Sequence, residues 1–246
     1  MLPVKKADKK QNNEKGSINQ EQLIYERVFD AILEQRLAPG ARLTEEPLGE
    51  IFGVSRTIIR RVLLRLSHEG VVDIQPNKGA RVITTPIEEV ADYFAARKIV
   101  ERAIIRIATK QITPYQIASL RSLAAEEKRY FESGTRGKGL RTSSEFHLQI
   151  AKIADNAPMM EFALKLISIT ALIVSQYQNL QAAPCAYCDH EALINAMEAG
   201  DADVAEQLMA EHIEHIMNTL QLEKSTQEPD LFKIFGGDQG NDENDH

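Results

Sequence analysis

Three histidines stand in otherwise apolar helical stripes in the second half of the sequence: His147, His190 and His212. Each has aliphatic or aromatic neighbours at the helical period of about 3.6 residues. A single histidine in such a stripe is commonly a hydrogen-bonded core residue. Three of them on converging helices can instead surround a divalent ion such as zinc, nickel or manganese, with positions open for water or a carboxylate. We therefore predict a metal site, with three core histidines as the alternative.

Two charged residues interrupt another apolar stripe, in the segment that follows Pro86. The stripe passes through Val90 and Phe94 and then meets Arg97 and Glu101. A buried charge is costly unless it is paired or faces a ligand or water-filled cavity. One interpretation is an ion pair between Arg97 and Glu101 at the edge of the stripe. In the other, Arg97 faces a cavity, where its planar guanidinium group suits a carboxylate.

A third group of side chains opens a predicted helix that ends near residue 69: Arg56, Thr57, Arg60 and Arg61. The other face of this helix repeats apolar residues at helical spacing, namely Ile59, Val62, Leu63 and Leu66. Cationic side chains in the first turns of a helix can enter the major groove of DNA and meet base edges and phosphates. An ordinary solvated helix face is the alternative.

The neighbouring sequence favours a DNA-reading helix over a solvated one. A preceding helix is predicted to begin after Thr44, with acidic residues in its first turn, and Gly53 supplies the turn before Ser55 caps the second helix. Residues 71–74 and 80–83 then alternate as two short strands around a polar tip. The pattern predicts a winged helix-turn-helix.

The whole chain is predicted to be mostly α, with a small β wing. The predicted segments are a disordered basic tail (1–19), a winged helix-turn-helix domain (20–85), an all-helical antiparallel bundle (86–224) and a disordered acidic tail (225–246). The predicted helices outside the helix-turn-helix are 20–36, 86–110, 114–133, 140–155, 158–180, 189–199 and 201–224. Thr85 as a cap and Pro86 as the first helical residue predict the domain boundary.

Charge and composition agree with this division. The net charge of the 246 residues is −7, yet residues 1–85 hold 14 Lys/Arg against 11 Asp/Glu, whereas the remainder holds 15 against 25. The predicted DNA-binding part is therefore the basic part, and the acidic part would keep the far side of the molecule off the phosphates. We expect no stretch to approach the roughly 20 apolar residues of a membrane span, and we expect a cytoplasmic protein.

Two cysteines, Cys185 and Cys188, precede the segment of His190. They are too few for a disulfide framework, which agrees with a cytoplasmic location. A lone CxxC pair is a weak indication of a zinc site or a redox switch, and the alternative is two cysteines in a loop.

The N-terminal domain resembles the GntR family of bacterial transcription regulators. The motifs LAPGARLTE, GVSRT and EGVVDIQPNKGARV carry the resemblance, in this order and spacing. The resemblance implies that Arg56, Thr57 and Arg60 contact operator DNA, and that the wing tip, from Asn77 through Lys78 to Gly79, lies near the minor groove or backbone.

This sequence departs from the family pattern at three positions of the helix pair. Glu46 stands where the family usually has an arginine that supports DNA contact, and Ile58 stands where proline is common. Arg61 stands where an acidic residue is frequent, and we hypothesise that it restores the missing positive charge.

Residues 86–224 resemble the FCD ligand-binding domain of the FadR branch of that family. The motifs FHLQIAKIADNAPM and DHEALINAMEAGDADVAEQLMAEHI carry this resemblance. It implies that Arg97 binds the carboxylate of a small organic acid, and that the three histidines hold a divalent metal. The family's fourth ligand is an aspartate one turn before the first histidine, where this chain has Ser143. Glu145 points to a different side of the helix, and we expect His215 at the rim.

Taken together, these features predict a ligand-responsive DNA-binding transcription regulator. A homodimer is expected, because two recognition helices related by a two-fold axis read a palindromic operator. The effector would favour one packing of the helical domain, and residues 84–86 would transmit that preference to the DNA readers. The alternatives are a regulator whose helical domain only dimerises, without metal or effector, and a metal-dependent enzyme. No catalytic residue is expected.

Overall fold

The computed structural model describes residues 7–75, 79–178 and 186–222, with side chains from residue 20 onward and, in the last range, from residue 189. The N-terminal elements are α1 (Ala7–Leu33), β1 (Arg42–Leu43), α2 (Glu45–Phe52), α3 (Arg56–His68), β2 (Val72–Gln75) and β3 (Gly79–Val82). The C-terminal elements are α4 (Ile87–Thr109), α5 (Pro114–Glu132), α6 (Arg136–Ile153), α7 (Ala157–Tyr177), α8 (Ala186–Glu198) and α9 (Ala202–Asn218). The predicted fold class, a winged helix-turn-helix followed by a helical domain, is confirmed.

The helix-turn-helix forms where the local signals place it. Gly53 adopts a left-handed φ of 63° at the end of α2, which is the conformation a glycine enters at least cost. Thr44 and Ser55 occupy the N-cap positions of α2 and α3, although neither side chain makes a capping hydrogen bond. The apolar face of α3 is buried as predicted, at Ile59, Val62, Leu63 and Leu66.

The wing is an antiparallel sheet with strand order β1-β3-β2. Its third strand, β1, was not predicted from the sequence, because two residues are too short to show an alternating pattern. Arg42 pairs with Arg81 and Leu43 with Ala80, so β1 covers the edge of β3. The sheet thereby connects the chain before the helix-turn-helix to the wing.

Two helices in the N-terminal half of the chain begin at residues other than those predicted. Helix α1 begins at Ala7, although residues 1–19 were predicted to be disordered. Residues 7–19 contain three lysines but also three asparagines and a glycine, so their own helix propensity is low. The helix there is an extension of the packed part of α1, because adding residues to an existing helix costs less than starting one. At the domain junction Pro86, rather than Thr85, is the N-cap of α4, because its ψ of 141° is not helical.

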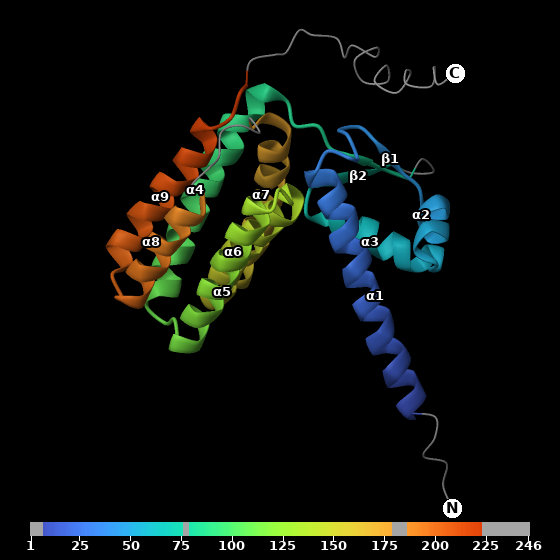
Figure 1. Ribbon diagram of the computed structural model, residues 1–246, viewed down its shortest axis with the longest axis horizontal. Coiled ribbons are helices and arrows are strands. Elements are labelled where there is room, and N and C mark those ends of the chain that lie inside the picture. The colour runs from blue at the N-terminus through green and yellow to red at the C-terminus, as the bar shows by residue number, and fades with distance from the viewer. Residues whose placement is uncertain (1–6, 76–78, 179–185, 223–246) are drawn as a thin grey trace, which may run out of the picture.

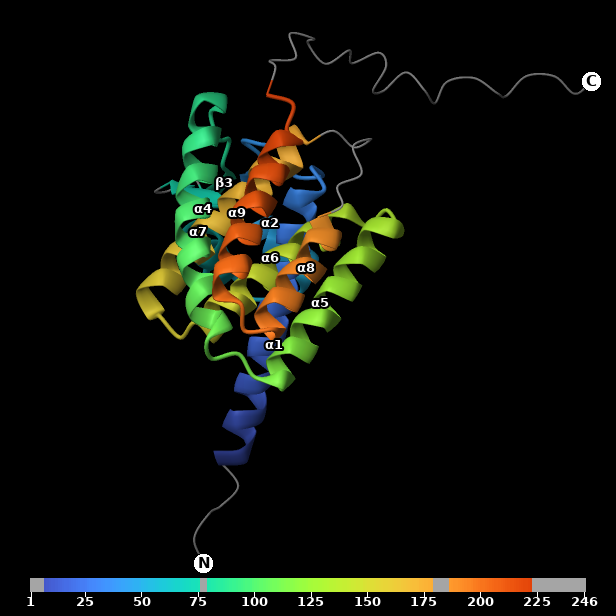
Figure 2. The ribbon, with the colours of Figure 1, turned by 90° about the vertical axis from the view of Figure 1, so that its left-hand side faces the viewer.

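The C-terminal helices form a bundle in which α4 packs against α7 and α9, and α5 against α6 and α8. Figure 2 shows α4, α9, α8 and α5 side by side as an outer layer. Figure 1 shows that α6 and α7 lie between this layer and the N-terminal domain. Helix α6 is therefore positioned to contact both the interior of the bundle and the N-terminal domain.

Helix α7 contradicts one expectation from the sequence. Its 21 residues have a mean hydropathy of 1.7 in their most apolar window, so it is long and apolar enough to cross a membrane. Half of that window is buried inside the fold. Packed against α4 and α6, α7 has the position of a core helix, which meets the same test of length and composition.

The two domains contact each other directly through α1, α6 and α7. Arg141 of α6 donates from Nε to Oδ1 of Asp30 in α1 at 2.7 Å. Gly137 allows the helices to approach, because a Cβ atom there would lie 2.5 Å from the Glu34 side chain and 2.9 Å from the Asp30 carbonyl oxygen. Helix α6 therefore contacts the N-terminal domain directly, in addition to the chain connection at residues 84–86.

Candidate metal centre and DNA-reading helix

The three predicted histidines come together in the centre of the bundle. His147 projects from α6, His190 from α8 and His212 from α9, and all three side chains are buried. Their Nε2 atoms form a nearly equilateral triangle, with separations of 3.3 Å between His147 and His190 and 3.2 Å for the other two pairs. These are the residues that can hold a metal ion in this cluster.

Each of these histidines has a carboxylate at its other ring nitrogen. Nδ1 of His147 lies 2.5 Å from Oε2 of Glu101, and Nδ1 of His190 lies 2.6 Å from Oε2 of Glu127. Nδ1 of His212 lies 3.2 Å from Oδ2 of Asp189. Such a carboxylate holds the proton on Nδ1 and leaves the lone pair on Nε2, as around histidines that bind metal.

Sequence reasoning missed Glu127 and Asp189 as partners of the histidines. For Glu127 a signal was present, because it continues the buried stripe of Ile117, Leu120 and Ala124 in α5. An acidic residue at a core position predicts a buried partner. Asp189 had no such signal, because it is one residue before His190 in the sequence but bonds to His212 on another helix.

Burial lowers the pKa of the His147 imidazole to about 3 and that of His212 to about 4, although their neighbouring carboxylates act in the opposite direction. Both rings are therefore neutral at neutral pH and keep a free lone pair. Burial raises the pKa of Glu101, but Arg97 and His147 together hold it well below its usual range. Glu101 is therefore charged and completes a buried chain from Arg97 to His147.

The cluster fits a divalent ion. With each Nδ1–H directed at a carboxylate, the three Nε2 atoms present only lone pairs to one another, an unfavourable contact unless a cation stands among them. The observed separations match the value of about 3.3 Å between two nitrogens bound tetrahedrally at about 2.0–2.1 Å from zinc. Nitrogen ligands of this type suit zinc and nickel in particular.

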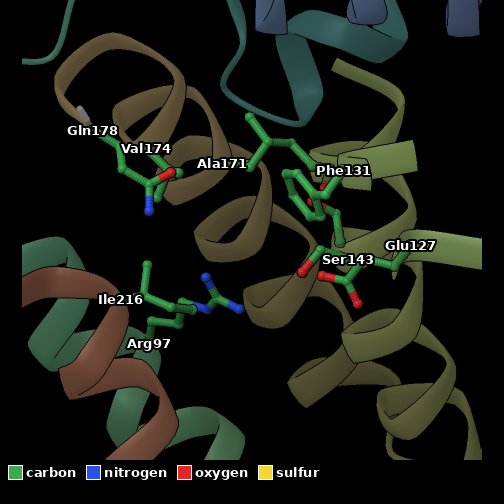
Figure 3. A pocket seen from close by; sticks show the side chains of 10 residues that line it. Arg97, Glu127, Phe131, Ser143, Ala171, Val174, Gln178 and Ile216 are labelled. Carbon is green, nitrogen blue, oxygen red and sulfur yellow. The ribbon is translucent and has the colours of Figure 1, made fainter. Parts of the chain in front are cut away.

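Arg97 is buried, and the two interpretations of it from the sequence are combined in the structure. Its Nε donates to Oε1 of Glu101 at 2.5 Å, and a terminal nitrogen donates to Oγ1 of Thr170 at 2.9 Å. The ion pair lies in the core, with 5% and 3% of the two side chains exposed, and not at the edge of a stripe. Arg97 also lines a cavity of about 40 Å³ together with Ser143. Figure 3 shows its guanidinium group directed into that cavity.

The structure also places the neighbours of the predicted metal site. Ser143 lines the same cavity as Arg97 and Glu127 but does not belong to the group of potential ligands. Glu145 binds Gln149 and Lys152 instead, away from the histidines. His215 is half exposed and bonds through Nδ1 to Asp189, which agrees with the expected place at the rim.

Helix α3 exposes the four residues predicted to contact DNA, Arg56, Thr57, Arg60 and Arg61. Each arginine has an acidic partner within its own domain, which the sequence reasoning did not foresee. Arg56 lies 2.5 Å from Glu46, Arg60 makes two bonds of 2.8 and 3.0 Å to Glu45, and Arg61 lies 3.3 Å from Glu21. The unusual Glu46 therefore neutralises a predicted DNA contact, and Arg61 has a partner of its own.

Most of the remaining residues predicted to have a role lie outside the described part of the chain. Asn77 and Lys78 lie outside the described residues, as do Cys185 and the Cys188 side chain. Gly79 is the first residue of β3, with φ of 79°, and a Cβ atom there would lie 2.8 Å from the Leu43 carbonyl oxygen. A glycine is therefore required at position 79, because β1 approaches the backbone too closely for a side chain.

Two family models match the chain in separate segments. The model described as "Bacterial regulatory proteins, gntR family" matches residues 20–82, and the model of the FCD domain matches residues 92–215. Together they cover most of the described chain.

Curated relatives are similar over most of their length. The "Uxu operon regulator" of Haemophilus influenzae is 24% identical, over 70% of this chain and 71% of that protein. The "HTH-type transcriptional repressor RspR" of Escherichia coli is 23% identical, over 86% of this chain and 92% of that protein. The first is named as an operon regulator and the second as a transcriptional repressor.

Solved structures share the fold. The Escherichia coli protein McbR/YncC matches with a TM-score of 0.68 and 20% identity, over 81% of this chain and 95% of that chain. A GntR regulator from a Rhodococcus species matches with a TM-score of 0.63 and 22% identity, over 81% and 96%. At these identities the likeness shows the fold alone.

Proposed function

Because the chain belongs to the GntR family of bacterial regulatory proteins and carries an FCD domain, it is a DNA-binding transcription regulator, and we propose that its FCD domain senses a small organic acid beside a bound divalent metal. The observation that carries the proposal is the buried triangle of Nε2 atoms from His147, His190 and His212. The named relatives are regulators, so the enzyme alternative is dropped.

The proposed metal ligands are the three histidines, and Glu101, Glu127 and Asp189 orient them. When bound, zinc, nickel or manganese would supply a Lewis-acidic centre for a carboxylate or water oxygen. Ser143 stands at the position of the family's fourth ligand, so we propose that water or the effector completes the coordination shell.

Metal analysis tests this proposal directly. Protein purified without a histidine tag should contain about one divalent ion per chain, because three neutral imidazoles converge. The His190→Ala variant should lose that ion, whereas His215→Ala, the matched change at the rim, should retain it. Equal metal content in the two variants, or none in the parent, would favour a helical domain that only dimerises.

Arg97 is the proposed anchor for the effector carboxylate. Its guanidinium group keeps donors beyond those taken by Glu101 and Thr170, and it lines the cavity. A thermal-shift screen of small carboxylic acids should find stabilising compounds for the parent and not for Arg97→Met. Arg102→Met on the exposed face of α4 is the control, because it removes an arginine that contacts α9 and not the cavity.

The two matched segments, 20–82 and 92–215, support a domain boundary at residues 85–86.

We further assign the chain to the FadR branch and propose a cytoplasmic homodimer that binds a palindromic operator, because paired recognition helices read two related half-sites. The proposed DNA contacts are Arg56, Thr57, Arg60 and Arg61 with the wing tip at residues 77–79. Sedimentation should give a molecular mass of twice the 27.6 kDa of one chain. A monomer that binds one half-site would refute the dimer.

A further inference from the structure

The outer face of the wing sheet carries two arginines directly opposite each other. Arg42 of β1 and Arg81 of β3 are register partners. Because side chains alternate along a strand, both point away from the face on which Leu43 and Ala80 are buried. The Cβ atoms of such a pair lie about 4.5–5.5 Å apart, and like charges at this separation destabilise a sheet. The pair therefore calls for a partner of negative charge.

The described part of the chain supplies no such partner to either arginine. Neither forms an ion pair with a described residue, and the guanidinium group of Arg81 donates to the carbonyl oxygen of Gly40 at 3.3 Å. Asp73 of β2 is the register partner of Arg81 on its other side, but its carboxylate accepts from Gln75 instead. Arg42 and Arg81 are therefore available to an anion from outside the described chain.

The two arginines lie close to the tip of the wing. Arg81 is two residues from Gly79, the last residue of the proposed tip, and Arg42 is held at the same level by its pairing with Arg81. Two strand residues span roughly 7 Å. Arg42 is exposed and Arg81 half-buried, and Figure 1 shows the sheet beside α2, apart from the C-terminal bundle. A duplex that meets the wing tip would therefore pass near both guanidinium groups.

We infer that Arg42 and Arg81 bind a backbone phosphate of DNA between them, beside the wing. The inference rests on the proposed DNA contacts of α3 and the wing tip, which bring the duplex to this side of the protein. A phosphate would offset the repulsion between the two cations and accept hydrogen bonds from both guanidinium groups. Because phosphates carry no sequence information, the pair would strengthen binding to every duplex and fix the wing on the backbone.

The salt dependence of DNA binding tests the inference without knowledge of the operator. Fluorescence anisotropy of the full-length protein with labelled duplexes of mixed sequence would cover about 50 to 200 mM KCl. The double variant Arg42→Gln, Arg81→Gln should weaken binding to all duplexes by a similar factor. It should also lower the slope of log K against log salt concentration by at least about one, because a phosphate loses its partner. An unchanged slope would overturn the inference.

Two further double variants separate a phosphate contact from other effects. Arg36→Gln, Arg102→Gln removes the same total charge from two exposed arginines that have acidic partners of their own, and it should keep the parental slope. An equal fall in slope would show an effect of net charge alone. Arg42→Lys, Arg81→Lys keeps both cations and should also keep most of the slope. A slope lost equally in the lysine variant would mean that the wing itself was altered, which contradicts the inference.

The stability of the free protein gives an independent measurement. The variant Arg42→Gln, Arg81→Gln removes a like-charge pair, so its melting temperature without DNA should equal that of the parent or exceed it. A lower melting temperature would show that the arginines serve the fold or bind a carboxylate of a second copy of the chain. Sedimentation would distinguish these two cases, and either one overturns the inference.

Failure of this inference can be distinguished from failure of the proposed DNA contacts. If Arg56→Gln weakens binding to the duplexes and lowers the slope, but the glutamine variant of the wing does not, only the inference fails. If neither variant changes DNA binding, the proposed DNA contacts on α3 fail, and the inference fails with them.

Discussion

Acidic side chains of α2 occupy two arginines of α3 that we propose as DNA contacts. Glu45 and Glu46 of α2 form ion pairs with Arg60 and Arg56 of α3. Exposed ion pairs of this kind contribute little to stability, because water and salt screen them. Their consequence is for the proposed binding, since DNA would have to displace the acidic partner of each arginine.

Substitution of Arg60 tests most directly whether α3 recognises the operator sequence. Arg60→Ala should weaken binding to the specific operator by roughly 5- to 150-fold at fixed salt, because a bidentate contact to a base is lost. Fluorescence anisotropy with operator and unrelated DNA measures the effect. Arg102→Ala on the sensor domain is the control. Unchanged operator affinity would exclude Arg60 from sequence readout.

Because Glu46 pairs with Arg56, removing the charge of Glu46 should raise the affinity of the protein for DNA. Glu46→Gln should release Arg56 and strengthen binding to any duplex, and should steepen the salt dependence by about one phosphate contact. Glu50→Gln is the matched control, because it removes the same charge from an exposed position of the same helix. If Glu46→Gln instead weakens operator binding alone, Glu46 itself contacts a base.

Among the secondary-structure elements, α6 joins the two proposed sites. It carries His147 toward the centre of the bundle and Arg141 toward Asp30 of α1, in addition to lining the cavity with Ser143. If ligand binding displaces α6, the side chains packed between α6 and α1 will therefore transmit the movement to the DNA-binding domain. This route complements the 84–86 junction that we proposed from the sequence.

Arg141→Gln tests this route. The variant should keep its metal, yet the change in operator affinity between zinc-loaded and chelated protein should fall toward none, because the Asp30 ion pair is weakened. The response can be no larger than the difference in metal affinity between the two conformations. Arg102→Gln should respond as the parent does. An undiminished response in Arg141→Gln would leave the 84–86 junction as the proposed route.

The contact between α1 and α3 predicts a pH dependence. Tyr25 donates to Glu69 at 2.5 Å and Arg65 is a neighbouring cation, yet burial raises the pKa of Glu69. A free carboxyl titrates near about 4.3. The raised folded pKa gives a stability contribution that is complete below that value and is lost as the pH rises through the folded pKa.

Denaturant unfolding at several pH values measures this contribution. Glu69→Gln cannot titrate, so its deficit in unfolding free energy relative to the parent should be largest near pH ~4 and shrink toward neutrality. Glu50→Gln, on an exposed helix face, serves as control. A deficit of Glu69→Gln that grows with pH would contradict the raised pKa.

For the whole molecule, the proposed metal would link three helices, α6, α8 and α9. Chelation should then lower the melting temperature by about 5–15 °C, since a ligand at 100 to 1,000 times its Kd stabilises by about 3–4 kcal/mol. Added zinc should restore the melting temperature. His190→Ala should show no shift on chelation, and a shift of equal size in that variant would place the stabilising ion elsewhere.

The sequence alone determined the features whose signals are local. The 3.6-residue period, Gly53 and the cap positions specified α2 and α3, and the same periodicity placed His147, His190 and His212 on core faces. Where the signal was weak, the prediction was wrong or incomplete, as at the start of α1 and at the two-residue strand β1. Helix propagation and strand pairing depend there on the packed neighbours.

Only the tertiary structure decided which groups meet. The partners of the histidines come from α4, α5 and α8, and no spacing in the sequence relates Glu101 to His147 or Glu127 to His190. The same holds for Arg56 with Glu46 and for Arg141 with Asp30. Periodicity tells which face of a helix is buried, but the rotation and crossing of helices, set by packing of the whole core, determine the atoms that come within bonding distance.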